Sequence, residues 1–477
     1  MNIIDYLKSN FLVANSTFIQ KVFSVISIFY ITNLSNLSTY GNYIIISSIA
    51  SLLLGCSSFG IGYNYMHKFS SAELNKKSHL FFSQFFTHFS IIILMVLFFL
   101  SFKSHINFFA NNDSFFLLFV SYFILLFFSD QLTNYFRYSE NFKFYSILVP
   151  MPIFLNFIFL SYFYFTEHKI DLYDIMYIMI LSLLIQIIIS FFLLIRKIKF
   201  KFSFLTKQEL LFDIKNGLPF RLNFLLNTIV NSSDRYIILF FLGSKYVGLY
   251  SILFTISSFV LMIPSVMTTI LQPTLSRLKI ENNLTEIKNI VQLSESLFFG
   301  LWVPFYVGGI FYINRIVDFF GDEIVFANSQ SVFIFLAFSL FFNGLMIIKG
   351  NIYFAFTETQ KMLKPIFIAS FLNVILNIIL IGFYKSILYA ALSSLLSYFI
   401  GFIFFQYELS RNHTIYFKLK HYHFIILSSI LMILMSILLD SLFLLNTNVL
   451  TLVKIAISGA TYFLCLTTFL KLFKWKN

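Results

Sequence analysis

The sequence predicts an all-α integral membrane protein with about 14 transmembrane helices. Of its 477 residues, 59% are hydrophobic and only 11% are charged. A soluble domain carries about 25% charged residues, so this chain has too little charge to cover a globular surface. Apolar segments of spanning length follow one another almost from end to end, and most of the 33 Lys and Arg residues fall in alternate gaps between them.

The positions of the spans follow from length, because a helix needs about 20 mostly apolar residues to cross a bilayer. We expect the abundant Phe side chains (69 residues) mainly on lipid-facing surfaces. In chain order, the predicted spans are 11–31, 40–64, 80–102, 114–136, 144–166, 172–195, 214–242, 247–274, 291–316, 329–352, 363–384, 387–408, 421–444 and 448–471.

The longest segment between spans, 196–213, is basic and predicts a linker between two bundles. Tyr40-Gly41-Asn42-Tyr43 opens the second span and Val247-Gly248-Leu249-Tyr250 opens the eighth, a shared G-x-Y that is typical of parallel transporter repeats. The predicted domains are an N-terminal six-helix lobe (1–195), the cytoplasmic linker (196–213), a C-terminal six-helix lobe (214–420) and two additional helices (421–477).

The distribution of basic residues predicts the orientation, because cytoplasmic loops are enriched in Lys and Arg. If the N-terminus is cytoplasmic, the loops on the other side hold only Lys103, Lys169, Lys245, Arg315 and Lys385. We therefore predict that both termini are cytoplasmic. The basic loop residues that make up the net charge of +13 are then explained by the orientation of the chain in the membrane. We therefore expect no nucleic-acid partner.

The sequence contains no motif for a cofactor, a metal or catalysis of a familiar kind. Cys56 and Cys465 lie far apart in apolar segments, without partners at metal-ligand spacing. The first apolar stretch holds Gln20 and Lys21 in its middle, which favours a span over a cleavable signal peptide. We expect no cofactor and no bound metal.

Polar residues inside spans are the candidate site residues, because a charge in hydrocarbon costs at least about 2.5 kcal/mol on insertion scales. Lys21 lies in the middle of the first span. Thr17, Gln20, Lys21, Ser24 and Ser27 follow helical spacing and give this helix one polar face. That face either points into the bundle or a water-filled cavity, or forms a hydrogen-bonded seam between helices.

The seventh predicted span has the most polar face. Its polar residues keep to one side of a helix and are Asn216, Asn223, Asn227, Asn231 and Asp234.

Three further residues of this span carry alternatives. Pro219 interrupts the helix near its cytoplasmic end and is a candidate hinge. Arg221 lies about two turns in from the cytoplasm and either faces the lumen or snorkels to the interface. Arg235 either forms a structural ion pair with Asp234 or takes part in function.

Asp130 is the one acidic residue of the first bundle with clear depth, and it either titrates as a coupling-ion site or pairs with Lys21. Lys349, Lys454 and Glu295 lie near span ends and are predicted to be snorkelling anchors. Deep basic residues outnumber acidic ones, so a lumen lined by these spans favours an anion such as phosphate or carboxylate.

Several motifs occur in a recognisable order. Residues 216–277 carry G-x-P, then D-R, then V-G-x-Y-S and a late P-x-x-S. Phe320-Gly321-Asp322-Glu323, the pair Asn373 and Asn377 in FLNVILNIIL, and LSTYGNY near the N-terminus add to the pattern. In this the chain resembles O-antigen and polysaccharide repeat-unit flippases (Wzx-like polysaccharide biosynthesis proteins) of the multidrug/oligosaccharidyl-lipid/polysaccharide exporter superfamily.

The resemblance implies two six-helix lobes in a V around a cavity that opens alternately to either side, plus two C-terminal helices. The substrate would be an undecaprenyl-diphosphate-linked oligosaccharide, from O-antigen or a related surface polysaccharide, moved from the cytoplasmic to the periplasmic leaflet of the bacterial inner membrane. The protein would be a transporter and not an enzyme. Besides the lipid bilayer, a polysaccharide polymerase and a chain-length regulator would be its partners.

The resemblance also suggests roles for the polar residues. Basic groups would attract the diphosphate and sugar acids, and amides would bind sugar hydroxyls. The substrate-binding residues would be Lys21, Arg221, Arg235, Asn223, Asn227, Asn231 and Gln20.

Three other functions compete with this interpretation. A multidrug or cation antiporter of the same superfamily needs buried carboxylates such as Asp130, but a cationic lumen argues against cationic drugs. A lipid II flippase shares the span layout and is expected to have more Arg in its cavity. A polysaccharide polymerase would have a large periplasmic loop with Arg or His, which we do not find here.

Overall fold

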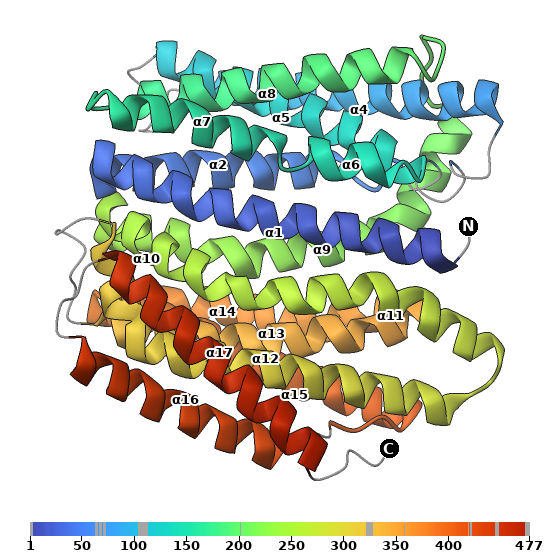
Figure 1. The fold of residues 1–477 in the computed structure, drawn as a ribbon. Coiled ribbons are helices and arrows are strands. Elements are labelled where there is room, and N and C mark those ends of the chain that lie inside the picture. The colour runs from blue at the N-terminus through green and yellow to red at the C-terminus, as the bar shows by residue number, and fades with distance from the viewer. Residues whose placement is uncertain are drawn as a thin grey trace. The chain divides into compact units, whose positions relative to one another are not determined.

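The computed structural model describes residues 3–62, 65, 69, 73–103, 113–200, 202–320, 328–356, 358–417, 419, 422–443 and 448–472. Every regular element in these ranges is a helix (Figure 1). The described helices provide 13 segments that are long and apolar enough to cross a membrane. The predicted all-α, multi-pass membrane protein is therefore confirmed.

The predicted span 214–242 corresponds to α9 (Lys207–Leu242), which is helical but is not among the 13 apolar segments. Its asparagines and charged residues account for this difference. A membrane helix with so many polar groups needs protein or water along one side. The sequence therefore predicted the helix correctly, and its polarity sets it apart from the other spans.

The chain divides into two compact units, Met1–Gly248 and Leu249–Asn477. The helix α9, which the sequence placed with the second bundle, belongs to the first unit because it packs against α2 (Leu37–Ser57). The domain limits drawn from the sequence remain a prediction.

The first unit contains α1 (Ile3–Leu34), α2, α4 (Leu74–Phe102), α5 (Asp113–Tyr138), α6 (Phe142–Leu148), α7 (Met151–Phe165), α8 (Leu172–Ile195), α9 and the start of α10 (Ser244–Ser257). The second unit contains the rest of α10, η2 (Ser258–Leu261), α11 (Met262–Ile280), α12 (Leu284–Asp318), α13 (Ser329–Ala355), η4 (Thr359–Met362), α14 (Leu363–Tyr384), α15 (Ile387–His413), α16 (Tyr422–Leu442) and α17 (Asn448–Leu472).

Two predicted spans are interrupted by proline. The span 144–166 is divided into α6 and α7 at Pro150, which lacks a backbone N–H to continue the hydrogen-bond ladder. The span 247–274 contains the 3₁₀ turn η2 shortly before Pro264, between α10 and α11. Proline thus explains why single apolar stretches become pairs of helices.

The second predicted span also ends earlier than expected, at Ser57 instead of residue 64. Gly60 and Gly62 follow with φ angles of 88° and 93°, a backbone conformation that suits glycine and cannot continue a right-handed helix. The chain therefore leaves the helix here and turns over the neighbouring helices.

Helix starts are encoded locally. A capping box begins α8, where Asp171 and Asp174 each accept a hydrogen bond from the other's backbone N–H, and another begins α9 with Thr206 and Glu209. These boxes satisfy backbone donors that the first turn of a helix leaves unpaired. They fix the points at which the chain enters both helices.

Phenylalanine fills the interior of the first unit as well as covering its surface. Phe69, Phe81 and Phe136 are at most 1% exposed and pack with Tyr65 and Tyr135 in one cluster. Ring centroids of Phe81 and Tyr135 lie 5.4 Å apart in an edge-to-face arrangement. Phe therefore serves the core as well as the surface, because edge-to-face pairs let aromatic rings pack well. That most Phe side chains face lipid stays a prediction.

The backbone of α2 touches the α9–α10 stretch at both of its ends. At one end Gly41 faces Gly248, so the glycines of the two G-x-Y motifs meet, and the Ser38 and Ser244 hydroxyls are 2.6 Å apart. At the other end Gly60 faces Gly217. A Cβ on any of these glycines would collide with the facing backbone, so only glycine allows this approach.

We predict that Gly217→Ala destabilises the protein by about 1–3 kcal/mol, because the new methyl group overlaps the backbone of Gly60. The measurement is the Tm of the detergent-solubilised protein. The matched control is Gly459→Ala in α17, where the new Cβ meets no atom within 4 Å. Equal Tm values for the two variants would contradict the close contact.

Candidate functional site

A polar cavity of about 270 Å³ lies in the first unit, where the chain beyond α2 meets α4, α5 and α9. Its floor includes the contact between Gly60 and Gly217. The polar side chains that line it are Tyr65, Gln84, Asp130, Gln131, Asn134, Arg137, Tyr138 and Arg221. Two of the residues that the sequence predicted, Asp130 and Arg221, therefore share one site.

Two guanidinium groups face this cavity from different helices, Arg137 on α5 and Arg221 on α9. Within the described ranges, neither side chain makes a hydrogen bond or an ion pair. The Arg137 guanidinium lies 5.8 Å from the ring centroid of Tyr138, a cation–π contact. The side chains that line the cavity therefore carry two positive charges and one carboxylate, and a second carboxylate, that of Asp213, accepts from Gly62 N at the rim.

The carboxylate of Asp130 is held by its own helix. Its Oδ2 accepts from Gln131 Nε2 at 3.2 Å, and Asn134 adds a side-chain hydrogen bond. The two arginines that act on it are Arg221 and Arg137. Lys21 is not among the groups that act on Asp130, and the alternative that the two residues pair stays a prediction.

A buried hydrogen-bond chain leads away from Asp130. Gln131 Oε1 accepts from Gln84 Nε2 at 2.8 Å, and Gln131 Nε2 lies 3.4 Å from His88 Nδ1. His88 Nε2 lies 2.8 Å from Ser57 Oγ, which donates to the carbonyl of Leu54. These roles assign an acceptor at Nδ1 and a proton at Nε2, so His88 is a neutral imidazole within this network.

The remaining basic candidates form a second group. Arg235 Nη1 donates to Ser48 Oγ on α2 at 3.0 Å, and its charge interacts with that of Lys21 on α1. Gln20 is half-buried beside Lys21, and Asp234 is buried at 1% exposure. Like charges held close together attract an anion, which fits the polar face predicted for α1.

The asparagines of α9 bond along their own helix. Asn227 Nδ2 donates to the carbonyl of Asn223 at 2.9 Å, and Asn231 Nδ2 donates to the carbonyl of Asn227 at 2.8 Å. One amide hydrogen of each is therefore used locally. Their role toward sugar hydroxyls stays a prediction.

The backbone of α9 is helical throughout Lys207–Leu242, and the side chain of Pro219 lies outside the described residues. The helix therefore continues through Pro219. Its role as a hinge stays a prediction.

The three residues that the sequence predicted as snorkelling anchors, Glu295, Lys349 and Lys454, are buried and form ion pairs, which corrects that prediction. Lys349 on α13 forms an ion pair with Glu295 on α12, and both side chains are fully buried. Lys454 is 1% exposed and pairs with Asp440. Snorkelling requires a free path to the interface, and packing against neighbouring helices removes that path.

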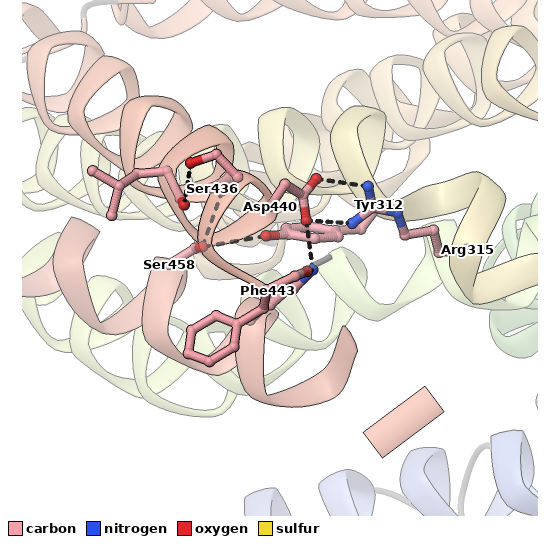
Figure 2. A network of polar contacts seen from close by, with 9 residues as sticks. Tyr312, Arg315, Ser436, Asp440, Phe443 and Ser458 are labelled. Atoms are coloured by element: carbon pink, nitrogen blue, oxygen red, sulfur yellow. Dashed lines mark hydrogen bonds and ion pairs between the residues drawn. The ribbon is translucent and has the colours of Figure 1, made fainter. Parts of the chain in front are cut away.

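Asp440 joins three helices (Figure 2). Both of its oxygens accept from Arg315 of α12, at 2.7 and 2.6 Å, and Oδ1 also accepts from Lys454 of α17 at 2.9 Å. Lys454 donates to the carbonyl of Phe443 as well. Two cations share one carboxylate here, and their charged hydrogen bonds attach α16 and α17 to α12, so the network has a structural role.

The last of the polar candidates, Asn373 and Asn377 of α14, are fully buried. Asn377 Nδ2 donates to Asn373 Oδ1 at 3.1 Å, and Asn373 Nδ2 donates to Ser394 Oγ of α15 at 3.2 Å. They form a hydrogen-bonded seam between two helices.

A second cavity, of about 320 Å³ and mostly apolar, lies among α12, α13, α16 and α17.

The sequence missed Arg137 as a site residue because its position near a span end suggested a topological charge. The signal was present, since Asp130, Asn134 and Arg137 are spaced i, i+4 and i+7 and so share one face of α5. Tyr65 and Gln84 come from other segments, and nothing in the local pattern marks them.

A family model described as "Polysaccharide biosynthesis protein" matches residues 34–325, more than half of the chain. The chain therefore belongs to this family, as its motifs suggested. Of the segment Phe320-Gly321-Asp322-Glu323 that contributed to the resemblance, all but Phe320 lie outside the described residues. No protein of curated function matches the sequence.

The fold is similar to solved transporters. The lipid II flippase MurJ in an inward closed conformation aligns with a TM-score of 0.72 and 19% identity, covering 97% of this chain and 99% of that one. A multidrug resistance MATE family transporter of the MOP superfamily, inward-facing, aligns with a TM-score of 0.66 and 13% identity over 82% and 95%. A MOP superfamily transporter from Pyrococcus furiosus aligns with a TM-score of 0.59 and 12% identity, covering 85% of this chain and 95% of that one.

These likenesses establish the MurJ- and MATE-like fold. The family match places the chain among the polysaccharide biosynthesis proteins, and its fold is similar to that of solved MOP superfamily transporters.

We predict that Asp440→Asn lowers the stability of the protein by about 1–3 kcal/mol, because Arg315 and Lys454 lose their shared anion. The readout is the Tm of the purified protein. Glu281→Gln is the control, since the Arg277–Glu281 pair is solvent-exposed at 3.8 Å and is worth less than about 1 kcal/mol. Similar Tm losses in both variants would argue against a structural role for Asp440.

Proposed function

We propose that this protein translocates undecaprenyl-diphosphate-linked oligosaccharide repeat units, of O-antigen or a related surface polysaccharide, by alternating access. The direction is from the cytoplasmic to the periplasmic leaflet of the bacterial inner membrane. The observation that carries the proposal is a polar cavity lined by two arginines in a member of a polysaccharide biosynthesis family. Such a cavity suits an anionic headgroup.

The physical problem supports this function. A sugar headgroup with a diphosphate cannot cross hydrocarbon unaided, because each buried polar group without a partner costs several kcal/mol. Polar side chains along the spans offer partners to the headgroup, while the polyprenyl tail stays in lipid. An anion that moves outward across about 100 mV also gains ~2.3 kcal/mol per charge, so the membrane potential can supply part of the driving force.

The position of the cavity along the helices fits transport from the cytoplasmic to the periplasmic leaflet. If both termini are cytoplasmic, as the loop charges indicate, the ends of α2 and α5 that border the cavity are the cytoplasmic ends. A lipid-linked repeat unit assembled in the cytoplasm would meet the cavity on this side. In this proposal Lys21, Gln20 and Arg235, with the asparagines of α9, contact the headgroup deeper in the membrane, and Asp130 is the candidate coupling site.

A lipid II flippase is the second candidate, because the MurJ fold covers 97% of this chain. The two substrates share a polyprenyl diphosphate and differ in their sugars. A multidrug antiporter is less well supported, since the two arginines that line the cavity repel cationic drugs.

We predict that deletion of the gene abolishes surface polysaccharide and that undecaprenyl-linked single repeat units accumulate on the cytoplasmic side, because the units are made but not moved. The measurement is analysis of lipid-linked intermediates with an assay of their sidedness. Re-expression of the wild-type chain is the control.

Other results would select other functions. Single units on the periplasmic side would indicate a polymerase. Accumulated lipid II with normal polysaccharide would indicate the lipid II flippase. Unchanged polysaccharide with increased drug sensitivity would indicate the antiporter.

In the deletion strain, we predict that Lys21→Gln and Arg235→Gln each restore at most about one-tenth of the wild-type polysaccharide, since each removes a charged hydrogen-bond donor. Lys169→Gln, at an exposed position between α7 and α8, is the matched control and should restore it fully. Immunoblots of membranes check expression. Full restoration by both test variants would remove Lys21 and Arg235 from the substrate path.

A further inference from the structure

We propose that the cavity between Arg137 and Arg221 is a binding site for a phosphate group. The chemistry of the site stands by itself. Only the identity of the natural ligand, the diphosphate of the lipid-linked substrate, rests on the proposed function.

The two arginines provide the main argument. Arg137 comes from the end of α5 and Arg221 from the first half of α9, so two different helices direct a guanidinium to one cavity. Neither makes a hydrogen bond or ion pair within the part of the chain that the structure describes. Arg221 is half-buried and Arg137 is exposed, and the one carboxylate that lines the cavity with them, that of Asp130, forms an ion pair with neither. Both guanidinium groups can therefore bind an anion that enters the cavity. Phosphate oxygens match the planar donor fork of arginine.

A buried hydroxyl points to the same ligand. Tyr65 is 3% exposed, and its hydroxyl has no hydrogen-bond partner among the described residues. It lines the cavity together with the arginines. A buried hydroxyl without a partner is unfavourable, and a bound phosphate oxygen would relieve this by accepting a hydrogen bond from it. Gln84 Oε1, 5% exposed as a residue, also has no partner within these ranges and can accept from a ligand hydroxyl or a water.

The size of the cavity limits the ligand. A volume of about 270 Å³ corresponds to roughly nine water molecules at about 30 Å³ each. A phosphate or diphosphate with a few waters fills this space, whereas a whole oligosaccharide does not fit. The site therefore takes the charged end of a larger substrate or a free phosphate.

Asp130 reduces the affinity of the same site. Its carboxylate shares the cavity with the guanidinium groups and repels an oxyanion. The other titratable groups around it are the phenols of Tyr65 and Tyr138, the neutral imidazole of His88 beyond Gln131, and Asp213, which accepts from Gly62 N at the rim. A resident carboxylate keeps binding weak enough for release, which a transporter needs.

The test uses the full-length protein in nanodiscs of phosphatidylcholine, so that no anionic lipid competes. Binding of radiolabelled pyrophosphate is measured by equilibrium dialysis. We expect Arg137→Gln and Arg221→Gln to weaken binding at least about tenfold, and Tyr65→Phe about threefold to tenfold. Asp130→Asn should strengthen binding about tenfold by removing the like charge. Arg411→Gln, an exposed position at the end of α15, is the matched control and should bind as the wild type does.

Several results would overturn the proposal. These are no pyrophosphate binding to the wild type, unchanged binding in both arginine variants, or equal loss in Arg411→Gln. Weaker pyrophosphate binding by Asp130→Asn would also overturn it. A misfolded cavity predicts weaker binding, whereas only the proposed repulsion by the Asp130 carboxylate predicts stronger binding. The Tm of each variant identifies any that fail to fold, and Arg137→Lys then replaces Arg137→Gln.

Competition separates the two possible sources of phosphate. Displacement of pyrophosphate by farnesyl diphosphate supports a lipid headgroup, and displacement by orthophosphate alone assigns the site to free phosphate and overturns the lipid assignment. Arginine-dependent binding in a protein whose deletion leaves polysaccharide intact would keep the site and reject the proposed function. If both arginine variants bind pyrophosphate as the wild type does, and deletion of the gene abolishes polysaccharide, the proposed function is kept and the phosphate site is rejected.

Discussion

Hydrocarbon does not solvate a charged side chain, and this single constraint organises the molecule. Each charge within the spans must meet an opposite charge, a dense set of hydrogen-bond partners, or a cavity. The second unit satisfies it with ion pairs, as between Glu295 and Lys349. In the first unit, Arg137 and Arg221 instead face a polar cavity. The charges of the second unit therefore hold its helices together, whereas the two arginines of the first unit are open to a ligand in the cavity.

The close approach of α2 to α9 and α10 makes that polar space possible. Glycines at both ends of α2 allow backbone contact, so α9 lies close enough for Arg221 to reach the cavity that α5 borders. Proline and glycine elsewhere decide where apolar stretches end, as at Pro150 and Gly60. Small residues thus set the positions from which the large charged ones act.

The sequence predicted the helices well because the length of an apolar stretch is a local property. It also identified Asp130 and Arg221, because a charge in an apolar span is visible without a structure. It failed for Lys349 and Lys454, whose partners lie on other helices, and for Arg137, whose place near a span end has an equally good topological explanation. A side chain's partner depends on tertiary packing, and no local pattern contains that information.

The paired charges of the second unit also bear on how the chain enters the membrane during synthesis. Glu295 and Lys349 lie on the consecutive helices α12 and α13, and Asp440 and Lys454 on the consecutive helices α16 and α17. A helix that leaves the translocon alone would bring a bare charge into lipid, whereas a hairpin brings a neutralised pair. Biogenesis of this unit is therefore expected to proceed by hairpins, with each second helix acting as the insertion partner of the first.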